Sequence, residues 1–177
     1  GSATSEAGIG MLRALIDTFA PEDHFNAIRP LFDNCEVILA SDVTNPLYGI
    51  NGAAHVFAKQ KGATSSMIEA LDARAKQFAS HTQRAMGFDK SMQPGAGAAG
   101  GLGYAFMQFL NAKMQSGAEL LLHLLQFDKL LAHADIVITG EGKSDCQTLM
   151  GKLPAVIMQH ARQHHLPTLL LSGQIED

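Results

Sequence analysis

Residues 135–173, DIVITGEGKSDCQTLMGKLPAVIMQHARQHHLPTLLLSG, decide the fold class of this 177-residue chain. Two short apolar runs, 135–140 and 167–173, are typical of buried strands. The segment between them, LPAVIMQHARQHH, is typical of a helix, and Pro154 takes the early position at which a helix tolerates proline. A strand, a helix and a second strand predict an α/β protein with a mostly parallel sheet flanked by helices.

The same alternation of strands and helices extends toward the N-terminus. EVILAS, residues 36–41, predicts another buried strand, and the apolar stripe of residues 11–19 predicts an amphipathic helix. Residues 53–59 favour a short helix, and Thr64 is a suitable N-cap for a longer helix that runs to about Met86. Residues 104–114 predict a buried helix that Gly117 ends, and residues 118–134 a helix or a helix pair. With no convincing linker, we expect one α/β region over residues 1–177.

Polar, turn-forming residues follow each predicted strand, as SDVTNP (41–46), TGEGKSD (139–145) and SGQIED (172–177). Ligands of open α/β sheets usually bind beyond the carboxyl ends of the strands. We therefore expect the three loops to converge at one edge of the sheet and to form a site there.

A glycine run, PGAGAAGGLG (94–103), contains the dinucleotide-binding spacing Gly95-x-Gly97-x-x-Gly100. That motif needs a strand leading into the turn, whereas MGFDKSMQ precedes this run, so the context argues against a nicotinamide-dependent enzyme. Two compatible interpretations stay open. The small residues allow close packing of backbones, and successive N–H groups of a glycine turn can bind an anion.

The loop after residue 140 has a partial phosphate-loop motif, Gly142-Lys143-Ser144. A true phosphate loop needs glycine five positions before Gly142, where Val137 stands. The carboxylates of Glu141 and Asp145 could bind Mg²⁺ or accept a hydroxyl proton, and Lys143 could neutralise phosphate charge; a solvated charged turn is the alternative. Asp42 has the same placement after residues 36–41, and its alternative is an Asx-turn.

Two further features favour ordinary roles. His160 and His164 lie four residues apart, which is metal-ligand spacing, but a solvated helix end explains them better because no HExxH pattern accompanies them. Cys146 has no identifiable partner for a nucleophilic role.

Composition limits the partners and the compartment. The formal net charge is −4 and no run of Lys or Arg occurs, which argues against nucleic acid and an anionic membrane surface as partners. Two cysteines without a CxxC pattern favour a reducing, cytoplasmic location.

Four segments together resemble the bacterial-type glycerate kinase family: GSATSEAGIGML (1–12), SDVTNPLYGINGAAHVFAKQKGA (41–63), PGAGAAGGLGYAF (94–106) and ITGEGKSDCQTLMGKLP (138–154). Members of that family are two-domain α/β kinases, about twice this long, that phosphorylate D-glycerate with ATP and Mg²⁺. The resemblance therefore implies that this chain is the central part of such a kinase, without its N-terminal phosphate loop and its C-terminal segment.

The resemblance also implies site residues. We expect Asp42, Asp145 and Lys143 to be catalytic, with Asp42 and Asp145 as the metal ligands. The residues expected at the cofactor are Gly95, Gly97, Gly100, Gly101, Gly140, Glu141 and Gly142. Substrate contacts are expected from Asn45, Ser2 and Thr4. The partners would be ATP and D-glycerate, and a homo-oligomer stays open.

Two departures from the family pattern bear on these roles. Ser5-Glu6-Ala7-Gly8 stands where the family usually has Asn-Asp-Gly-Gly, and Lys143 stands where arginine is usual, which keeps the charge but loses a bidentate fork. The alternative to a kinase is a non-catalytic domain, either a folded piece or a degenerate binding module of such an enzyme.

Overall fold

The structure, a computed structural model, describes residues 2–21, 24–144 and 153–175. The chain divides into two compact units, Gly1–Met114 and Gln115–Asp177, and each is described by itself. Helices and short two-stranded sheets occur in both parts of the chain, so the α/β class is confirmed.

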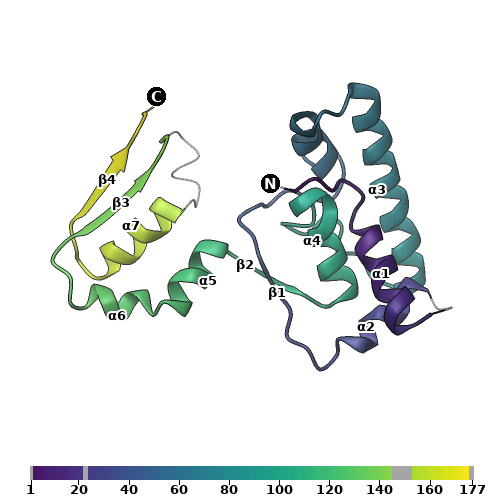
Figure 1. Cartoon of the computed structure of the whole chain (residues 1–177), viewed down its shortest axis with the longest axis horizontal. Coiled ribbons are helices and arrows are strands. Elements are labelled where there is room, and N and C mark those ends of the chain that lie inside the picture. Colours follow the sequence, from purple (N-terminus) through teal and green to yellow (C-terminus); the bar gives the residue numbers. More distant parts are fainter. Residues whose placement is uncertain (1, 22–23, 145–152, 176–177) are drawn as a thin grey trace. The chain divides into compact units, whose positions relative to one another are not determined.

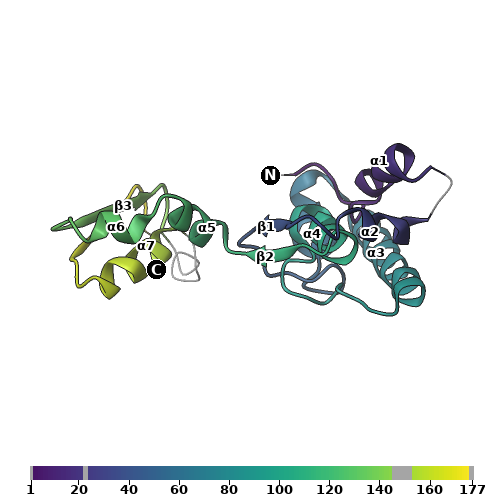
Figure 2. The ribbon, with the colours of Figure 1, turned by 90° about the horizontal axis from the view of Figure 1, so that it is seen from below.

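The first unit is mainly helical (Figure 1). Its longest helix, α3, begins directly after Thr64, whose side-chain oxygen accepts a hydrogen bond from the Met67 N–H at 3.3 Å, as the sequence predicts. Strands β1 and β2 pair in a two-stranded sheet, and Figure 2 shows them next to each other. The elements are α1 (Ile9–Phe19), η1 (Phe25–Ala27), α2 (Ile28–Leu31), β1 (Ile38–Ala40), η2 (Ala54–Ala58), η3 (Lys59–Lys61), α3 (Ser65–Met86), α4 (Ala98–Phe109) and β2 (Lys113–Gln115).

The core of the first unit forms where α1, α3 and α4 meet. Leu12 of α1 is fully buried, and so are Tyr104 and Phe109 of α4. Phe78 of α3 stacks on Phe109 with ring centroids 6.0 Å apart and meets Tyr104 edge-on at 5.9 Å. Such aromatic pairs stabilise by about 0.5–1.5 kcal/mol beyond the burial of their area. This core holds α4, and with it the glycine run, in place.

The second unit contains a β-α-β arrangement in which β3 pairs with β4 in parallel, from Val137 opposite Thr168 to Glu141 opposite Ser172. Helix α7 packs against both strands (Figure 1). Of the two possibilities left open for residues 118–134, a helix or a helix pair, the structure has the pair, because Gln126, at φ +52°, interrupts the helix. The elements are α5 (Gly117–Leu124), α6 (Phe127–Leu131), β3 (Val137–Glu141), α7 (Leu153–Gln163) and β4 (Thr168–Ser172).

Three expectations about the strands and helices need correction. The strands are not buried on both faces: Val137 and Thr139 are buried, whereas Ile138 is 60% and Leu171 56% exposed, because residues alternate between the faces of a sheet. Strand β1 pairs with β2 and not with β3 or β4, so its loop does not share a sheet edge with theirs. The helix predicted over residues 104–114 ends at Phe109, because Asn111 is left-handed at φ +54°.

Candidate functional site

The glycine run lies against two other segments that carry the family motifs. The Gly97 N–H donates to the Asn45 carbonyl oxygen at 2.8 Å, and a side chain at Gly97 would collide with the carbonyl oxygen of Pro46. A side chain at Gly100 would collide with the carbonyl oxygen of Thr4, and one at Gly101 would lie 2.6 Å from Cα of Ala7. The close-packing interpretation is therefore confirmed, and three segments distant in sequence meet at one place.

The backbone of the run makes an unusual turn before the regular part of α4. Ala99, Gly100 and Gly101 are consecutive and all left-handed, with φ of +51°, +70° and +95°. A left-handed alanine costs about 1–2 kcal/mol, and Ala99 is exposed, so the packing of its buried neighbours Ala98 and Gly100 must hold this conformation. Anion binding by Gly95 and its neighbours stays a prediction.

A lysine that sequence analysis did not single out lies beside this turn. Lys61 Nζ donates to the Thr4 carbonyl oxygen at 2.6 Å, to Ser2 Oγ at 3.2 Å and to Ser5 Oγ at 3.5 Å. Two of these residues, Ser2 and Thr4, are expected substrate contacts. Because the partners of Lys61 are more than 50 positions away in sequence, only its place in the family-like segment 41–63 could have pointed to it.

Lys61 lines a cavity of about 710 Å³ that opens beside the glycine turn. The volume lies in the range of small-molecule sites. Helical turns η2 and η3 supply part of its wall, and η2 is a π-helical turn, a conformation that often marks functional sites. The lining residues are Ser2, Val43, Phe57, Gln60, Lys61, Ala99 and Gly100.

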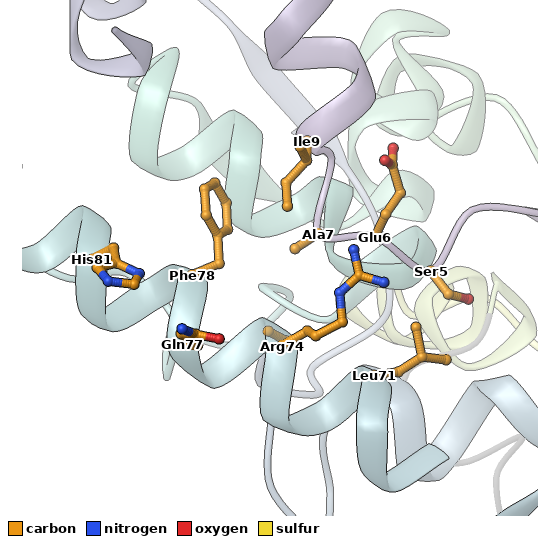
Figure 3. A pocket seen from close by; sticks show the side chains of 10 residues that line it. Ser5, Glu6, Ala7, Ile9, Leu71, Arg74, Gln77, Phe78 and His81 are labelled. Atoms are coloured by element: carbon orange, nitrogen blue, oxygen red, sulfur yellow. The ribbon is translucent and has the colours of Figure 1, made fainter. Parts of the chain in front are cut away.

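A smaller cavity of about 200 Å³ lies between the N-terminal segment and α3 (Figure 3). Ser5 and Glu6 face it from one side, and Arg74 and His81 from the other. Both carboxylate oxygens of Glu6 accept a hydrogen bond from the Gly10 N–H, at 3.1 and 3.0 Å. Glu6 therefore caps the first turn of α1, which gives the departure from the family pattern at this position a structural role.

The loop after β1 is tied by its own polar groups. Asn45 Nδ2 donates to the Asn51 carbonyl oxygen at 2.9 Å, and the Val43 N–H donates to Ser41 Oγ at 3.2 Å. Asp42 lies between these contacts with an exposed side chain. Asn45 thus uses its side-chain N–H within the loop and its backbone oxygen on Gly97, so its substrate contact stays a prediction.

The loop after β3 belongs to the second unit. Ser144 Oγ donates to Glu141 Oε1, at 2.8 Å, and also lies 2.9 Å from Ser172 Oγ. Gly140 lies against the backbone of Leu171, where an added side chain would meet the carbonyl oxygen at 3.0 Å. Gly142 and Lys143 are exposed. Asp145 and Cys146 lie outside the described residues.

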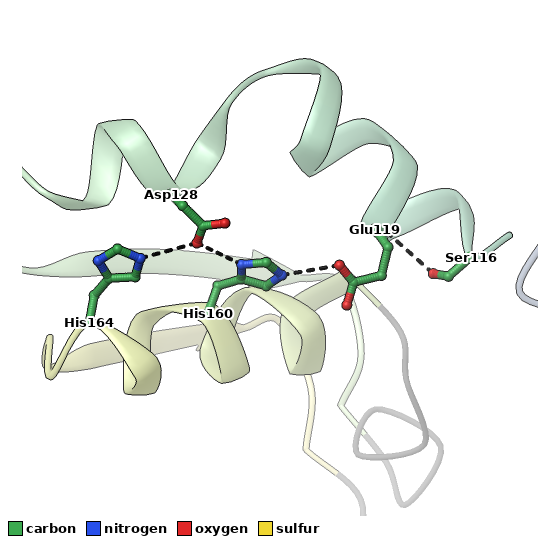
Figure 4. A network of polar contacts seen from close by, with 5 residues as sticks. All are labelled: Ser116, Glu119, Asp128, His160 and His164. Atoms are coloured by element: carbon green, nitrogen blue, oxygen red, sulfur yellow. Dashed lines mark hydrogen bonds and ion pairs between the residues drawn. The ribbon is translucent and has the colours of Figure 1, made fainter.

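His160 of α7 and His164, which directly follows that helix, share one face, as their spacing predicts, but both contact a carboxylate, which a solvated helix end does not explain (Figure 4). His160 is 16% exposed; its Nδ1 lies 2.8 Å from Asp128 Oδ1 and its Nε2 lies 3.1 Å from Glu119 Oε2. His164 Nε2 lies 3.2 Å from the same Asp128 oxygen. The hydrogen bond to Asp128 is the main cause that raises the pKa of His160, and the same bond lowers the pKa of Asp128.

The described residues contain neither a metal-binding cluster nor a membrane-spanning helix. No group of three or more His, Cys, Asp or Glu side chains in residues 2–21, 24–144 and 153–175 is placed to hold a metal ion. In the same part of the chain, every helix is too short or too polar to cross a membrane.

Comparison with known proteins identifies the family. The fold and the site define a class of protein: an α/β protein whose polar motifs lie in the loops after its strands and in a glycine-rich loop. The model of the glycerate kinase family matches residues 20–177, and the chain belongs to that family.

Individual relatives agree with this assignment. The chain is 37% identical to glycerate 2-kinase of Escherichia coli K12, over all of its own length and 51% of the relative's. It is 35% identical to glycerate kinase of Bacillus subtilis 168, over 99% of its own length and 50% of the relative's. A crystal structure described as "putative glycerate kinase 2" of Salmonella typhimurium LT2 superposes with a TM-score of 0.78 at 35% identity, over 98% of this chain and 51% of the other. The chain thus spans about half the length of the relatives it matches.

Proposed function

We propose that this chain is part of an ATP-dependent glycerate kinase that transfers a phosphoryl group from ATP to a hydroxyl of D-glycerate. The observation that carries the proposal is the meeting of three family-like segments at the glycine turn, beside a cavity of small-molecule size. Family membership and the names of the relatives support the choice of reaction.

The proposed reaction needs little covalent chemistry from the protein. Phosphoryl transfer proceeds in line, and the enzyme contributes mainly by positioning the reactants and neutralising charge. Asp42 or Asp145 would accept the proton of the glycerate hydroxyl, and Lys143 would neutralise phosphate charge. Ser2, Thr4 and Asn45 would contact the substrate.

The nucleotide would be held by backbone groups. The N–H groups of Gly95 and Gly100 would bind phosphate oxygens. The N–H groups of Gly97 and Gly101 already donate to the carbonyl oxygens of Asn45 and Gly97, so these two glycines would contribute by leaving room for the phosphates. In the second unit, Gly140, Glu141 and Gly142 would be the cofactor contacts. In the described residues, Glu141 already accepts a hydrogen bond from Ser144, which would fix the carboxylate in place.

Mg²⁺ would compensate the charge of the nucleotide phosphates. In nucleotide sites Mg²⁺ usually takes one or two carboxylates, with waters and phosphate oxygens as its other ligands. The exposed carboxylate of Asp42 fits that requirement in the first unit, and Asp145 is the metal ligand proposed in the second. A site of this kind does not need the three-residue protein cluster that is absent from the described residues.

Substitution of the two aspartates tests these roles. In the protein produced over its whole reading frame, Asp42→Asn and Asp145→Asn should each lower kcat with ATP and D-glycerate by about 100-fold or more, because an amide does not accept the proton and, without a negative charge, binds Mg²⁺ more weakly. Asp33→Asn, an exposed aspartate of the first unit, is the matched control and should leave kcat within about twofold. Unimpaired turnover in both variants would refute the assignment of these residues.

One observation favours a second candidate, a non-catalytic domain. Ser5-Glu6-Ala7-Gly8, in the segment that packs against the glycine run, departs from the family pattern. This alternative predicts that the 177-residue chain binds a ligand but shows no turnover. The protein produced over its whole reading frame is assayed in parallel under the same conditions. Turnover by the 177-residue chain on its own would exclude the alternative.

A further inference from the structure

The strongest feature outside the expected site residues is Lys61, which has only neutral partners. Its ammonium group donates to a carbonyl oxygen and to two serine hydroxyls. None of the carboxylates in the described part of the chain lies within ion-pair distance of it. Partial burial lowers the pKa of Lys61, and no neighbouring charge offsets that effect. Within the described residues, therefore, no carboxylate neutralises the positive charge of Lys61.

The serine hydroxyls around Lys61 add hydrogen-bond donors. A hydroxyl that accepts from an ammonium group keeps its own proton, which it can donate elsewhere. Ser2 and Ser5 therefore have O–H groups available for an acceptor near Lys61. Thr4 Oγ1 is buried and has no hydrogen-bond partner, which is a further unsatisfied polar atom in the same segment.

The cavity beside Lys61 has the charge that an anion requires. Among the described residues, its lining includes one cation and no carboxylate, with the Ser2 hydroxyl and the Gln60 side chain as the other polar groups. Ala99 and Gly100 close one side with left-handed backbone. At about 710 Å³ it can hold a three-carbon acid or a phosphate group together with water.

We propose that this cavity is an oxyanion-binding site in which Lys61 is the cation that binds a carboxylate or phosphate group, assisted by the hydroxyl of Ser2. This site rests on the proposed function, which supplies two candidate oxyanions: the carboxylate of D-glycerate and a phosphate of ATP. Lysine binds such groups as a point charge, and charge-assisted hydrogen bonds are stronger than neutral ones.

Binding measurements separate the two sources. In the protein produced over its whole reading frame, Lys61→Gln should weaken binding of one anion by 10-fold or more in calorimetry. Loss confined to D-glycerate assigns the carboxylate, and loss confined to ATP assigns the phosphate. Lys59→Gln, in the same helical turn but exposed and outside the cavity, is the matched control and should bind both within twofold. Folded Lys61→Gln protein with unchanged affinity for both anions would overturn the proposal.

A second measurement covers the case in which Lys61→Gln does not fold. In unmodified protein with isotope-labelled lysine, addition of D-glycerate or of ATP should shift the side-chain NMR signals of Lys61 and leave those of Lys59 in place. No shift of Lys61 with either anion, at concentrations that saturate the protein, would overturn the proposal.

Failure of this inference is distinguishable from failure of the proposed function. Glycerate phosphorylation with unchanged anion affinity in Lys61→Gln would refute the Lys61 site and leave the kinase proposal standing. Lys61-dependent anion binding without any phosphoryl transfer would refute the kinase proposal and support the site.

Discussion

At the scale of single residues, the glycines of the 95–103 run are required by what lies opposite them. Gly100 combines two demands, because its φ is +70° and an added Cβ would collide with the carbonyl oxygen of Thr4. Gly87 at the end of α3 meets only the first demand, since its φ is +79° and nothing lies within 4 Å of an added Cβ. The two positions therefore separate backbone strain from close packing.

Alanine at these two glycines should have unequal effects on stability. We expect Gly87→Ala to lower the free energy of unfolding by about 1 kcal/mol, the usual cost of a left-handed alanine. Gly100→Ala should cost clearly more, about 3 kcal/mol, because the N-terminal segment must also move away. Urea unfolding of both variants measures the difference. Equal costs would show that Thr4 does not pack against Gly100.

Residue patterns predicted the close packing of the glycines but not what they pack against. Glycine and alanine density is visible in sequence, whereas the contacts of Gly97 with Asn45 and Pro46 join segments about 50 positions apart. Lys61 was missed for the same reason. From sequence alone, a lysine next to a glycine is expected to be solvated. Only the structure shows that Ser2 and Thr4 lie beside Lys61.

At the scale of elements, local signals were the most reliable. The Thr64 cap and the length of α3 follow from short-range chemistry, and both were predicted. The end of α4 at Phe109 was not predicted, because no proline marks it in the sequence and the left-handed conformation of Asn111 is visible only in the structure. The pairing of β1 with β2 was not predicted either. Strand β2 has only three residues, Lys113–Gln115, and the sequence pattern there predicts a helix.

The contacts among α5, α6 and α7 predict a dependence of stability on pH. Ionised carboxylates only accept hydrogen bonds, and both ring nitrogens of His160 face carboxylates, so His160 satisfies both contacts only as the imidazolium. Its pKa is raised above the ordinary 6.5, so this stabilisation is complete below about pH 6.5 and is lost as pH rises through the raised value. The pKa of Asp128 is lowered from 3.8, so its contribution is lost only as pH falls through that lower value.

The effect is measurable as the difference in unfolding free energy between the unsubstituted protein and His160→Gln. We expect a difference on the order of 1 kcal/mol at pH 6 that becomes small by pH 9. His133→Gln is the control, because the exposed side chain of His133 makes none of these contacts, and it should show little change with pH. A difference for His160→Gln that grows toward pH 9 would contradict the assigned protonation.

At the scale of the whole molecule, the expected site residues divide between the two units. Ser2, Thr4, Asp42, Asn45 and the glycines of the 95–103 run belong to the first. Gly140, Glu141, Gly142 and Lys143 belong to the second, and Asp145, in the same stretch of sequence, lies outside the described residues. Family membership was predictable because four motifs occur in order along the chain, and each motif is local.

The central claim is that the protein containing this chain phosphorylates D-glycerate. The most direct test is an assay of that protein, produced over its whole reading frame, with ATP, Mg²⁺ and D-glycerate, in which ADP and phosphoglycerate are both quantified. We expect ADP release that depends on D-glycerate and an equal amount of phosphoglycerate. Folded protein that binds neither ATP nor D-glycerate, or that forms no phosphorylated product from D-glycerate, would contradict it.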